Sequence, residues 1–204
     1  MGKRQKVAMG QVYDGLHDGL TEFIRQQHIF FVATGPLAGD GRINLSPKGL
    51  DTFRILGPTT VAYLDLTGSG VETAAHLREN GRMTVMFCAF AGRPLILRLY
   101  GRGRVIEPID AEWARWAVEF PVYPGIRSVV VLEVDRIATS CGFGVPLYDY
   151  REVRTQLSGW SDRLGPEGLA RYRSEKNSRS IDGLEGLRSA GRRDSREAGG
   201  HDVP

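Results

Sequence analysis

Hydrophobic and polar residues alternate along much of the chain between residues 28 and 144, with the period of two that is typical of β-strands. In residues 42–48 the polar side chains fall on one face, while Ile43, Leu45 and Pro47 fall on the other. We predict strands over residues 28–34, 42–48, 59–65, 82–90, 94–106 and 128–134. The last of these is apolar at nearly every position, so we expect it to be buried on both of its faces.

Apolar residues recur at helical spacing in three further places. We predict helices over residues 11–27, 70–80 and 110–120. Asp110 is a suitable N-cap for the third helix, and Gly81 stops the second. Residues 148–187 are polar and helical in character, with a break at Gly165-Pro166.

This order of elements is typical of a small antiparallel barrel with helices packed on it. Glycine accounts for 26 of the 204 residues, well above its usual share of about 7%, and shows no repeat period. We interpret these glycines as tight turns and bends of the barrel. Gly101 and Gly103 share a face with Leu97 and Leu99, which indicates a bend of their strand toward the core.

The charge of the chain bears on which partners it binds, and its cysteines bear on the cellular compartment in which it works. The net charge of +3 is evenly spread, which favours neither nucleic acid nor a membrane surface. The longest stretch without a charged residue, residues 26–39, is shorter than the roughly 20 apolar residues that span a membrane. The basic N-terminus is not followed by an apolar run, so we expect no signal peptide. Cys88 and Cys141 are then expected to be reduced thiols of a cytoplasmic protein.

A glycine-rich turn between a predicted strand and a predicted helix, residues 67–73, is the first candidate for chemistry. Such a turn points backbone N–H groups outward at the positive end of a helix, where anions bind. The hydroxyls of Thr67, Ser69 and Thr73 add donors for a phosphate. The competing interpretation is structural, because Ser69 and Glu72 have the spacing of a capping box. A carboxylate in the first turn also competes with an anion for the same donors.

Basic residues on two predicted strands are the second candidate. The polar face of residues 42–48, which ends at Lys48, and the basic positions of residues 98–104 supply the positive charge that the turn lacks. The competing interpretation is a solvated strand face, which we favour for Arg102 and Arg104.

The histidines show no metal-ligand spacing, and no nucleophile–histidine–carboxylate order is present. His76 lies one turn beyond Thr73. His28 lies at the start of the first predicted strand and is a candidate haem ligand. We favour a surface or capping role for both. No metal site and no catalytic residue are predicted.

Three segments, NLSPKG, AYLDLTGSGVETAAHLRENGRMTVMF and PLILRLYGRGRV, occur in an order that resembles the pyridoxamine 5′-phosphate oxidase-like, FMN-binding split-barrel family. The resemblance runs from about Phe23 to Val134. It implies a mainly β chain with α, namely a split antiparallel β-barrel with flanking helices. It also implies a homodimer with flavin mononucleotide (FMN) bound at the interface between the subunits.

The resemblance also implies, by position, which residues bind the cofactor. They are Ser46, Lys48, Tyr63, Thr67, Ser69, Thr73 and Arg98. In pyridoxamine phosphate oxidases a basic pair follows the turn serine, whereas this chain has Gly70, Val71 and Glu72. The aromatic, basic C-terminal ending that binds the pyridoxal substrate is not evident either. We therefore expect no vitamin B6 activity.

The leading hypothesis is an FMN-dependent oxidoreductase that acts on a small-molecule substrate or electron donor. A flavin performs the chemistry itself, so no catalytic acid or base need be visible in the sequence. The alternatives are a deazaflavin cofactor or haem, a non-catalytic protein that binds flavin or haem on the same barrel, and a dimeric scaffold without ligand. We expect a flavin-binding domain over residues 1–147, a helical extension over residues 148–187 that covers the barrel or clasps a partner subunit, and a disordered tail over residues 188–204.

Overall fold

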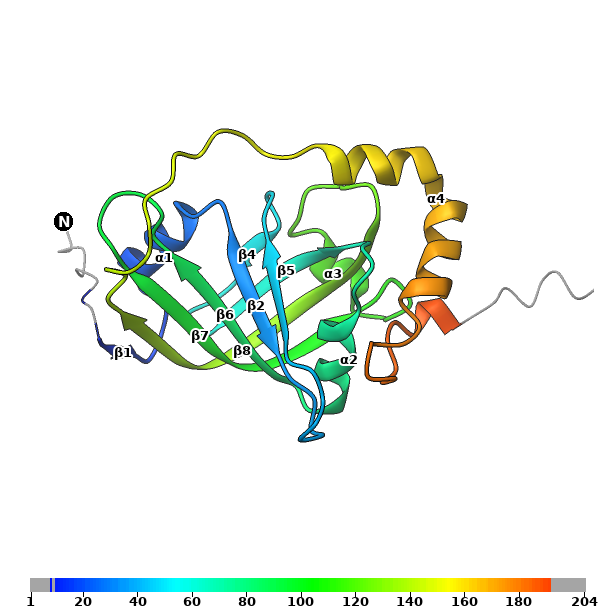
Figure 1. The fold of residues 1–204 in the computed structure, drawn as a ribbon, viewed down its shortest axis with the longest axis horizontal. Coiled ribbons are helices and arrows are strands. Elements are labelled where there is room, and N and C mark those ends of the chain that lie inside the picture. The colour runs from blue at the N-terminus through cyan, green and yellow to red at the C-terminus, as the bar shows by residue number, and fades with distance from the viewer. Residues whose placement is uncertain (1–7, 9, 192–204) are drawn as a thin grey trace, which may run out of the picture.

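The computed structural model describes residue 8 and residues 10–191, which fold around one strongly curved sheet (Figure 1). Its strands are β1 (Val12–Tyr13), β2 (Phe30–Thr34), β3 (Asn44–Lys48), β4 (Phe53–Ile55), β5 (Thr60–Leu66), β6 (Arg82–Cys88), β7 (Ile96–Ile106) and β8 (Ile126–Ser140). They pair in the order β3-β2-β6-β7-β8-β5-β4, with β1 added to β8, and every pairing is antiparallel. The predicted split antiparallel barrel is thus confirmed, with β3 and β4 as the two open edges of the sheet.

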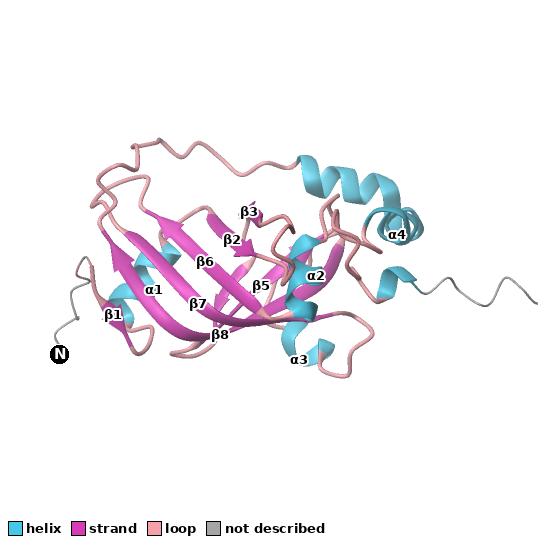
Figure 2. Cartoon of the chain, turned by 60° about the horizontal axis from the view of Figure 1, so that its bottom comes forward, coloured by secondary structure: helices cyan, strands magenta, loops and turns pink. Residues whose placement is uncertain are grey.

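The helices lie mainly at the two ends of the sheet. Figure 2 shows α1 (Asp18–Arg25) at one end, and α2 (Glu72–Glu79) and α4 (Gln156–Lys176) at the other. The shorter α3 (Trp113–Ala117) and the 3-10 helix η1 (Ser189–Gly191) complete the described elements. None of the helices in the described part of the chain is both long and apolar enough to cross a membrane.

The prediction of one helix over residues 11–27 is wrong at its N-terminal half. Val12 pairs with Ala138 of β8, because β5 begins opposite Glu133 and leaves the rest of β8 with an open edge that β1 takes. The helix begins only at Asp18, where the Nδ1 atom of His17 accepts a hydrogen bond from the N–H of Gly19 at 3.1 Å.

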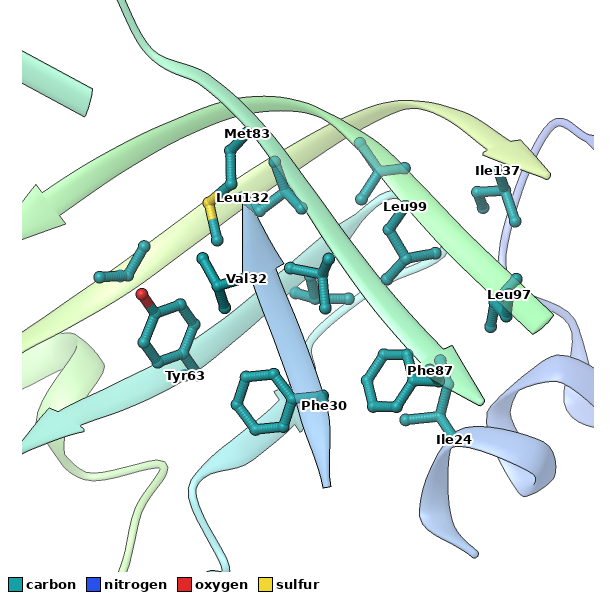
Figure 3. Close-up of a cluster of buried hydrophobic side chains, with 14 of the residues drawn as sticks. Ile24, Phe30, Val32, Tyr63, Met83, Phe87, Leu97, Leu99, Leu132 and Ile137 are labelled. Carbon is teal, nitrogen blue, oxygen red and sulfur yellow. The ribbon is translucent and has the colours of Figure 1, made fainter. Parts of the chain in front are cut away.

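The concave face of the sheet holds the main hydrophobic core (Figure 3). Phe30 and Val32 of β2 point into it, and the other face of β5 and β8 packs against Trp116 and Phe120 around α3. The central residues of β8 are therefore buried on both faces, as predicted. Burial of these apolar side chains on two sides supplies the main favourable term in folding.

Other boundaries differ from the prediction. Strand β4 was not predicted, β8 extends beyond residues 128–134 in both directions, and α3 is shorter than expected. Asp110 is not the cap of α3, because its carboxylate accepts a hydrogen bond from the N–H of Glu107 at 2.8 Å. The predicted bend at Gly101 is confirmed: the register shifts there, and a Cβ atom would lie 2.0 Å from the carbonyl oxygen of Glu133.

After β8 the chain forms an extended strap, residues 141–155, which runs the length of the molecule to α4 (Figure 1). Residues 148–155 are therefore not helical, in contrast to the prediction. The predicted break at Gly165 is confirmed, because this residue has φ +64° and kinks α4.

The C-terminal segment, residues 177–191, folds back onto α2. Leu187 and Ala190 pack against Val71 and Ala74, and the backbone of Arg188 donates a hydrogen bond to the buried carboxylate of Glu107 at 3.0 Å. The prediction of a disordered tail is therefore wrong for residues 188–191, whose long-range contacts the local composition does not reveal. Residues 192–204 lie outside the described part of the chain.

Candidate functional site

The opening between the two sheet edges is a groove with a volume of about 1250 Å³, here called the seam groove. Its walls are β3, the loop that leads into β4, the turn after β5, and the strap residues 150–154. Ligand pockets usually measure about 300–1,000 Å³. The seam groove therefore has room for a cofactor-sized ligand together with a second small molecule.

The polar face of β3 points into the seam groove. Ser46 and Lys48 pair in register with the buried residues Val32 and Phe30, so all four side chains share the concave side of the sheet. Ser46 donates a hydrogen bond to Asn44 at 2.9 Å. Asn44 in turn donates to the hydroxyls of Thr34 (3.2 Å) and Thr73 (3.0 Å), so its amide is fixed at the groove wall.

A buried ion triad lies at the inner end of the groove. The carboxylate of Asp65 accepts from the Nζ atom of Lys48 at 2.9 Å and from the Nε atom of Arg127 at 2.7 Å. Burial by itself raises the pKa of Asp65, but the charges of Arg127 and Lys48 outweigh burial and hold this pKa well below its ordinary value. The triad carries one net positive charge and leaves Lys48, 23% exposed, with donors to spare.

The glycine-rich turn differs in part from its sequence interpretation. The N-cap of α2 is Val71 without a side-chain cap, so the predicted capping box of Ser69 and Glu72 does not form. Glu72 instead accepts a hydrogen bond from the N–H of Ile181 at 3.3 Å. The hydroxyl of Thr67 has no O–H left to donate to a phosphate, because it donates to the carbonyl of Gly125 at 2.7 Å; it also accepts from Arg173 at 2.9 Å. Thr67 nevertheless lines the groove, whereas the exposed Ser69 is not among its lining residues.

Two candidate residues lie away from the groove. Tyr63 is buried in the core (Figure 3), and burial raises the pKa of its phenol well above the ordinary value. Arg98 pairs in register with Met86 and Ala138 on the convex face of the sheet and donates to Ser140 at 3.0 Å. The structure thus brings Ser46, Lys48, Thr67 and Thr73 together in one groove, with Tyr63 behind the wall and Arg98 on the opposite face.

Sequence reasoning missed the polar and charged residues that organise the site. Arg127 stands at the start of an apolar strand. Asn177 and Arg173 belong to the C-terminal extension, which was expected to cover the barrel or clasp a partner subunit but not to supply residues to the site. The one available signal was a lone arginine and a lone aspartate at the ends of two otherwise buried strands. Such charges need a partner when they are buried.

The remaining candidate side chains have other partners. His28 lines the seam groove and stacks on Tyr150, with 3.6 Å between ring centroids. His76 is fully buried, and its Nδ1 atom lies 3.0 Å from the hydroxyl of Thr34. Cys88 is a buried free thiol and Cys141 an exposed one. Across the described residues there is no cluster of three or more histidine, cysteine or acidic side chains able to hold a metal ion.

Comparison of the sequence with known proteins gives the class of protein. The chain belongs to the pyridoxamine 5′-phosphate oxidase family, whose family model matches residues 16–141. A curated relative, the pyridoxamine 5′-phosphate oxidase family protein ustO of Aspergillus flavus, is 43% identical over 195 residues, which cover 87% of this chain and 78% of the relative.

Two solved structures are also similar. A tagged form of the HupZ protein of Group A Streptococcus shares 22% identity at a TM-score of 0.47 and covers 60% of this chain and 91% of its own. A pyridoxamine 5′-phosphate oxidase-related, FMN-binding protein of Nostoc punctiforme shares 13% identity at a TM-score of 0.42, over 55% of this chain and 73% of its own.

Proposed function

We propose that the protein binds FMN in the seam groove and acts as a flavin-dependent oxidoreductase on a small-molecule substrate or electron donor. The observation that carries the proposal is the composition of the groove. Its inner end combines the ammonium group of Lys48 with the glycine-rich turn at the start of α2, in a chain of this family.

The residues present suit the parts of FMN. Lys48 retains two N–H donors beyond its bond to Asp65, which suits a phosphate. Leu50, Phe53 and Leu66 form apolar stretches of the groove wall that suit a planar ring system. Besides Asp65, which is paired with Lys48 and Arg127, Glu72 is an acidic residue at the phosphate end. Its charge lowers the affinity for a dianion without removing the donors.

FMN, when bound, supplies hydride or electron transfer. The residues of the chain bind and orient it: Lys48 holds the phosphate, and the fixed amide of Asn44 and the hydroxyl of Ser46 offer polar contacts along β3. Tyr150 and Val153 of the strap line the outer part of the groove and offer apolar contacts to a bound ring system.

The absorbance spectrum of the purified protein tests the cofactor directly. We expect the two near-ultraviolet and blue bands of an oxidised flavin. A deazaflavin lacks the longer-wavelength band, and a Soret band indicates haem, for which His28 in the groove wall is the available ligand. Either of these spectra contradicts the FMN assignment. A flavin spectrum without turnover of any electron donor favours the non-catalytic alternative.

We also propose a homodimer. The outer face of the β2–β3 hairpin exposes Leu37, Ile43 and Leu45, and the strap exposes Phe143 and Leu147, so both segments leave apolar surface uncovered. Two-fold pairing is the commonest way to cover such a surface. Light scattering is expected to give twice the mass of the chain, and a stable monomer at micromolar concentration contradicts this prediction.

The Lys48→Ala variant is expected to bind FMN ten- to a hundredfold more weakly, because the loss of a hydrogen bond to a charged group costs about 1.5–3 kcal/mol. Riboflavin, which lacks the phosphate, is the internal control and is expected to keep its affinity. Since Lys48 also pairs with the buried Asp65, the variant is expected to melt at a lower temperature, so the affinity ratio is the diagnostic quantity. Equal affinity of variant and wild type for FMN contradicts the phosphate assignment.

A further inference from the structure

The turn of residues 68–70 is held from its buried side by two side chains that come from distant parts of the sequence. Arg127 donates to the carbonyl oxygens of Gly68 at 3.2 Å and Gly70 at 2.8 Å. Asn177 donates to the carbonyl of Gly68 at 2.9 Å and, more weakly, to that of Ser69 at 3.5 Å. Its own Oδ1 atom accepts from Arg127 at 3.0 Å, and Asn177 and Arg127 are 0% and 5% exposed.

These contacts fix the direction of the N–H groups that follow. A trans peptide unit is planar, with its C=O and the next N–H pointing in opposite directions, and the described residues contain no cis peptide bond. The N–H groups of Ser69, Gly70 and Val71 therefore point to the exposed side of the turn. Within the described chain none of the three donates a hydrogen bond to a protein acceptor.

Three neighbouring N–H groups that converge on one side form a concave site for an anion, here reinforced by the N-terminal end of α2. Gly68 and Gly70 line the same end of the seam groove as Lys48, whose ammonium group comes from the opposite wall. The turn and the lysine therefore border one end of the groove, where Asp65 links Lys48 to Arg127, the residue that holds the turn.

We infer that Asn177 is a positioning residue for the flavin phosphate. It clamps the carbonyls of the turn on the buried side and thereby presents the N–H groups to the ligand. The inference rests on the proposed function and deepens it, because Asn177 lies in the C-terminal segment, beyond the residues that the family model matches. Affinity for the phosphate would then depend on an extension of this chain rather than on the barrel alone.

The test compares FMN with riboflavin in the full-length Asn177→Ala variant, by quenching of flavin fluorescence. We expect FMN affinity to fall about tenfold or more, since the turn relaxes, while riboflavin affinity stays within a factor of about two. The matched control is Ser189→Ala, which loosens the other anchor of the C-terminal segment by removing a 2.7 Å hydrogen bond to Glu107. This control is expected to lower the melting temperature but to leave the FMN-to-riboflavin affinity ratio unchanged.

Amide NMR spectra give a second measurement, because they report whether the N–H groups of the turn contact the phosphate of the flavin. The resonances of Ser69, Gly70 and Val71 are expected to shift when FMN is added to the wild type, and to shift little with riboflavin. If Asn177→Ala does not fold, Asn177→Ser, which keeps one hydroxyl donor, is expected to show an intermediate loss of FMN affinity.

The outcomes separate the two proposals. A wild type that prefers FMN to riboflavin, with the same preference in the Asn177 variants, overturns the positioning role and leaves the flavin site intact. Equal losses for both flavins overturn it as well, because they indicate a general loss of structure. A wild type that binds neither flavin overturns the proposed function, and the positioning role with it.

Discussion

The Asp65→Asn variant is expected to lose about 3–5 kcal/mol of the free energy of unfolding, a large part of the roughly 5–15 kcal/mol that stabilises a typical domain. Asp65 is 3% exposed and is the shared partner of Lys48 and Arg127. The asparagine keeps the volume but leaves the buried Arg127 and the partly exposed Lys48 without a counter-charge. Urea denaturation followed by circular dichroism measures the loss.

The matched control is Asp51→Asn, which removes an exposed carboxylate from its pair with Arg54. Exposed pairs contribute about 1 kcal/mol or less, so this variant is expected to remain close to the wild type. Similar losses in the two variants contradict the assignment of a buried triad.

The pH dependence gives an independent check on Asp65. Its pKa is lowered in the folded protein, so its contribution to stability is complete above the unfolded value of about 4 and is lost as the pH falls below it. The wild type is therefore expected to lose stability steeply below about pH 4, and Asp65→Asn is expected to show a shallower slope in that range. Parallel slopes contradict the low pKa.

The second large effect is expected for Glu107→Gln, with a loss of about 3 kcal/mol. The carboxylate of Glu107 is fully buried and accepts from the guanidinium of Arg78, the N–H of Arg188 and the N–H and hydroxyl of Ser189. Glutamine removes the charge and turns an N–H₂ group toward donors. The C-terminal segment then loses its anchor, which thermal unfolding and proteolysis beyond Lys176 both report.

The control for this variant is Glu112→Gln, whose carboxylate is half exposed in its pair with Arg104. It is expected to change the free energy of unfolding by less than about 1 kcal/mol. Resistance of Glu107→Gln to proteolysis at the wild-type rate contradicts the anchoring role.

The elements that could be predicted from the sequence are those long enough to show a period. Strand β3 displays five alternating positions, and β8 a long apolar run, so both were found. Strands β1 and β4, with two and three residues, have too few positions to show any alternation. They exist because neighbouring strands leave edges for them to pair with, and such pairing is decided by tertiary structure.

The candidate site, like the fold, could be predicted only where a local pattern in the sequence marks its residues. Alternation in residues 42–48 placed Ser46 and Lys48 on one face, and that face does line the groove. The same argument placed Arg98 on one face of its strand, and that face lies on the convex side of the sheet, away from the groove. Contacts such as the one between Asn177 and Gly68 join residues 109 positions apart, and no local pattern encodes them.

The two open edges of the split barrel have a consequence for how the protein behaves at high concentration. The N–H and C=O groups of an unpaired edge strand can form hydrogen bonds with a strand of another molecule, which promotes aggregation. Here β3 contains Pro47, which has no N–H to donate. Strand β4 is only three residues long and contains Arg54. The guanidinium of Arg54 donates a hydrogen bond to the carbonyl oxygen of Phe53, which is then less available to another strand. The same opening that admits a ligand is thus poorly suited to template another β-strand.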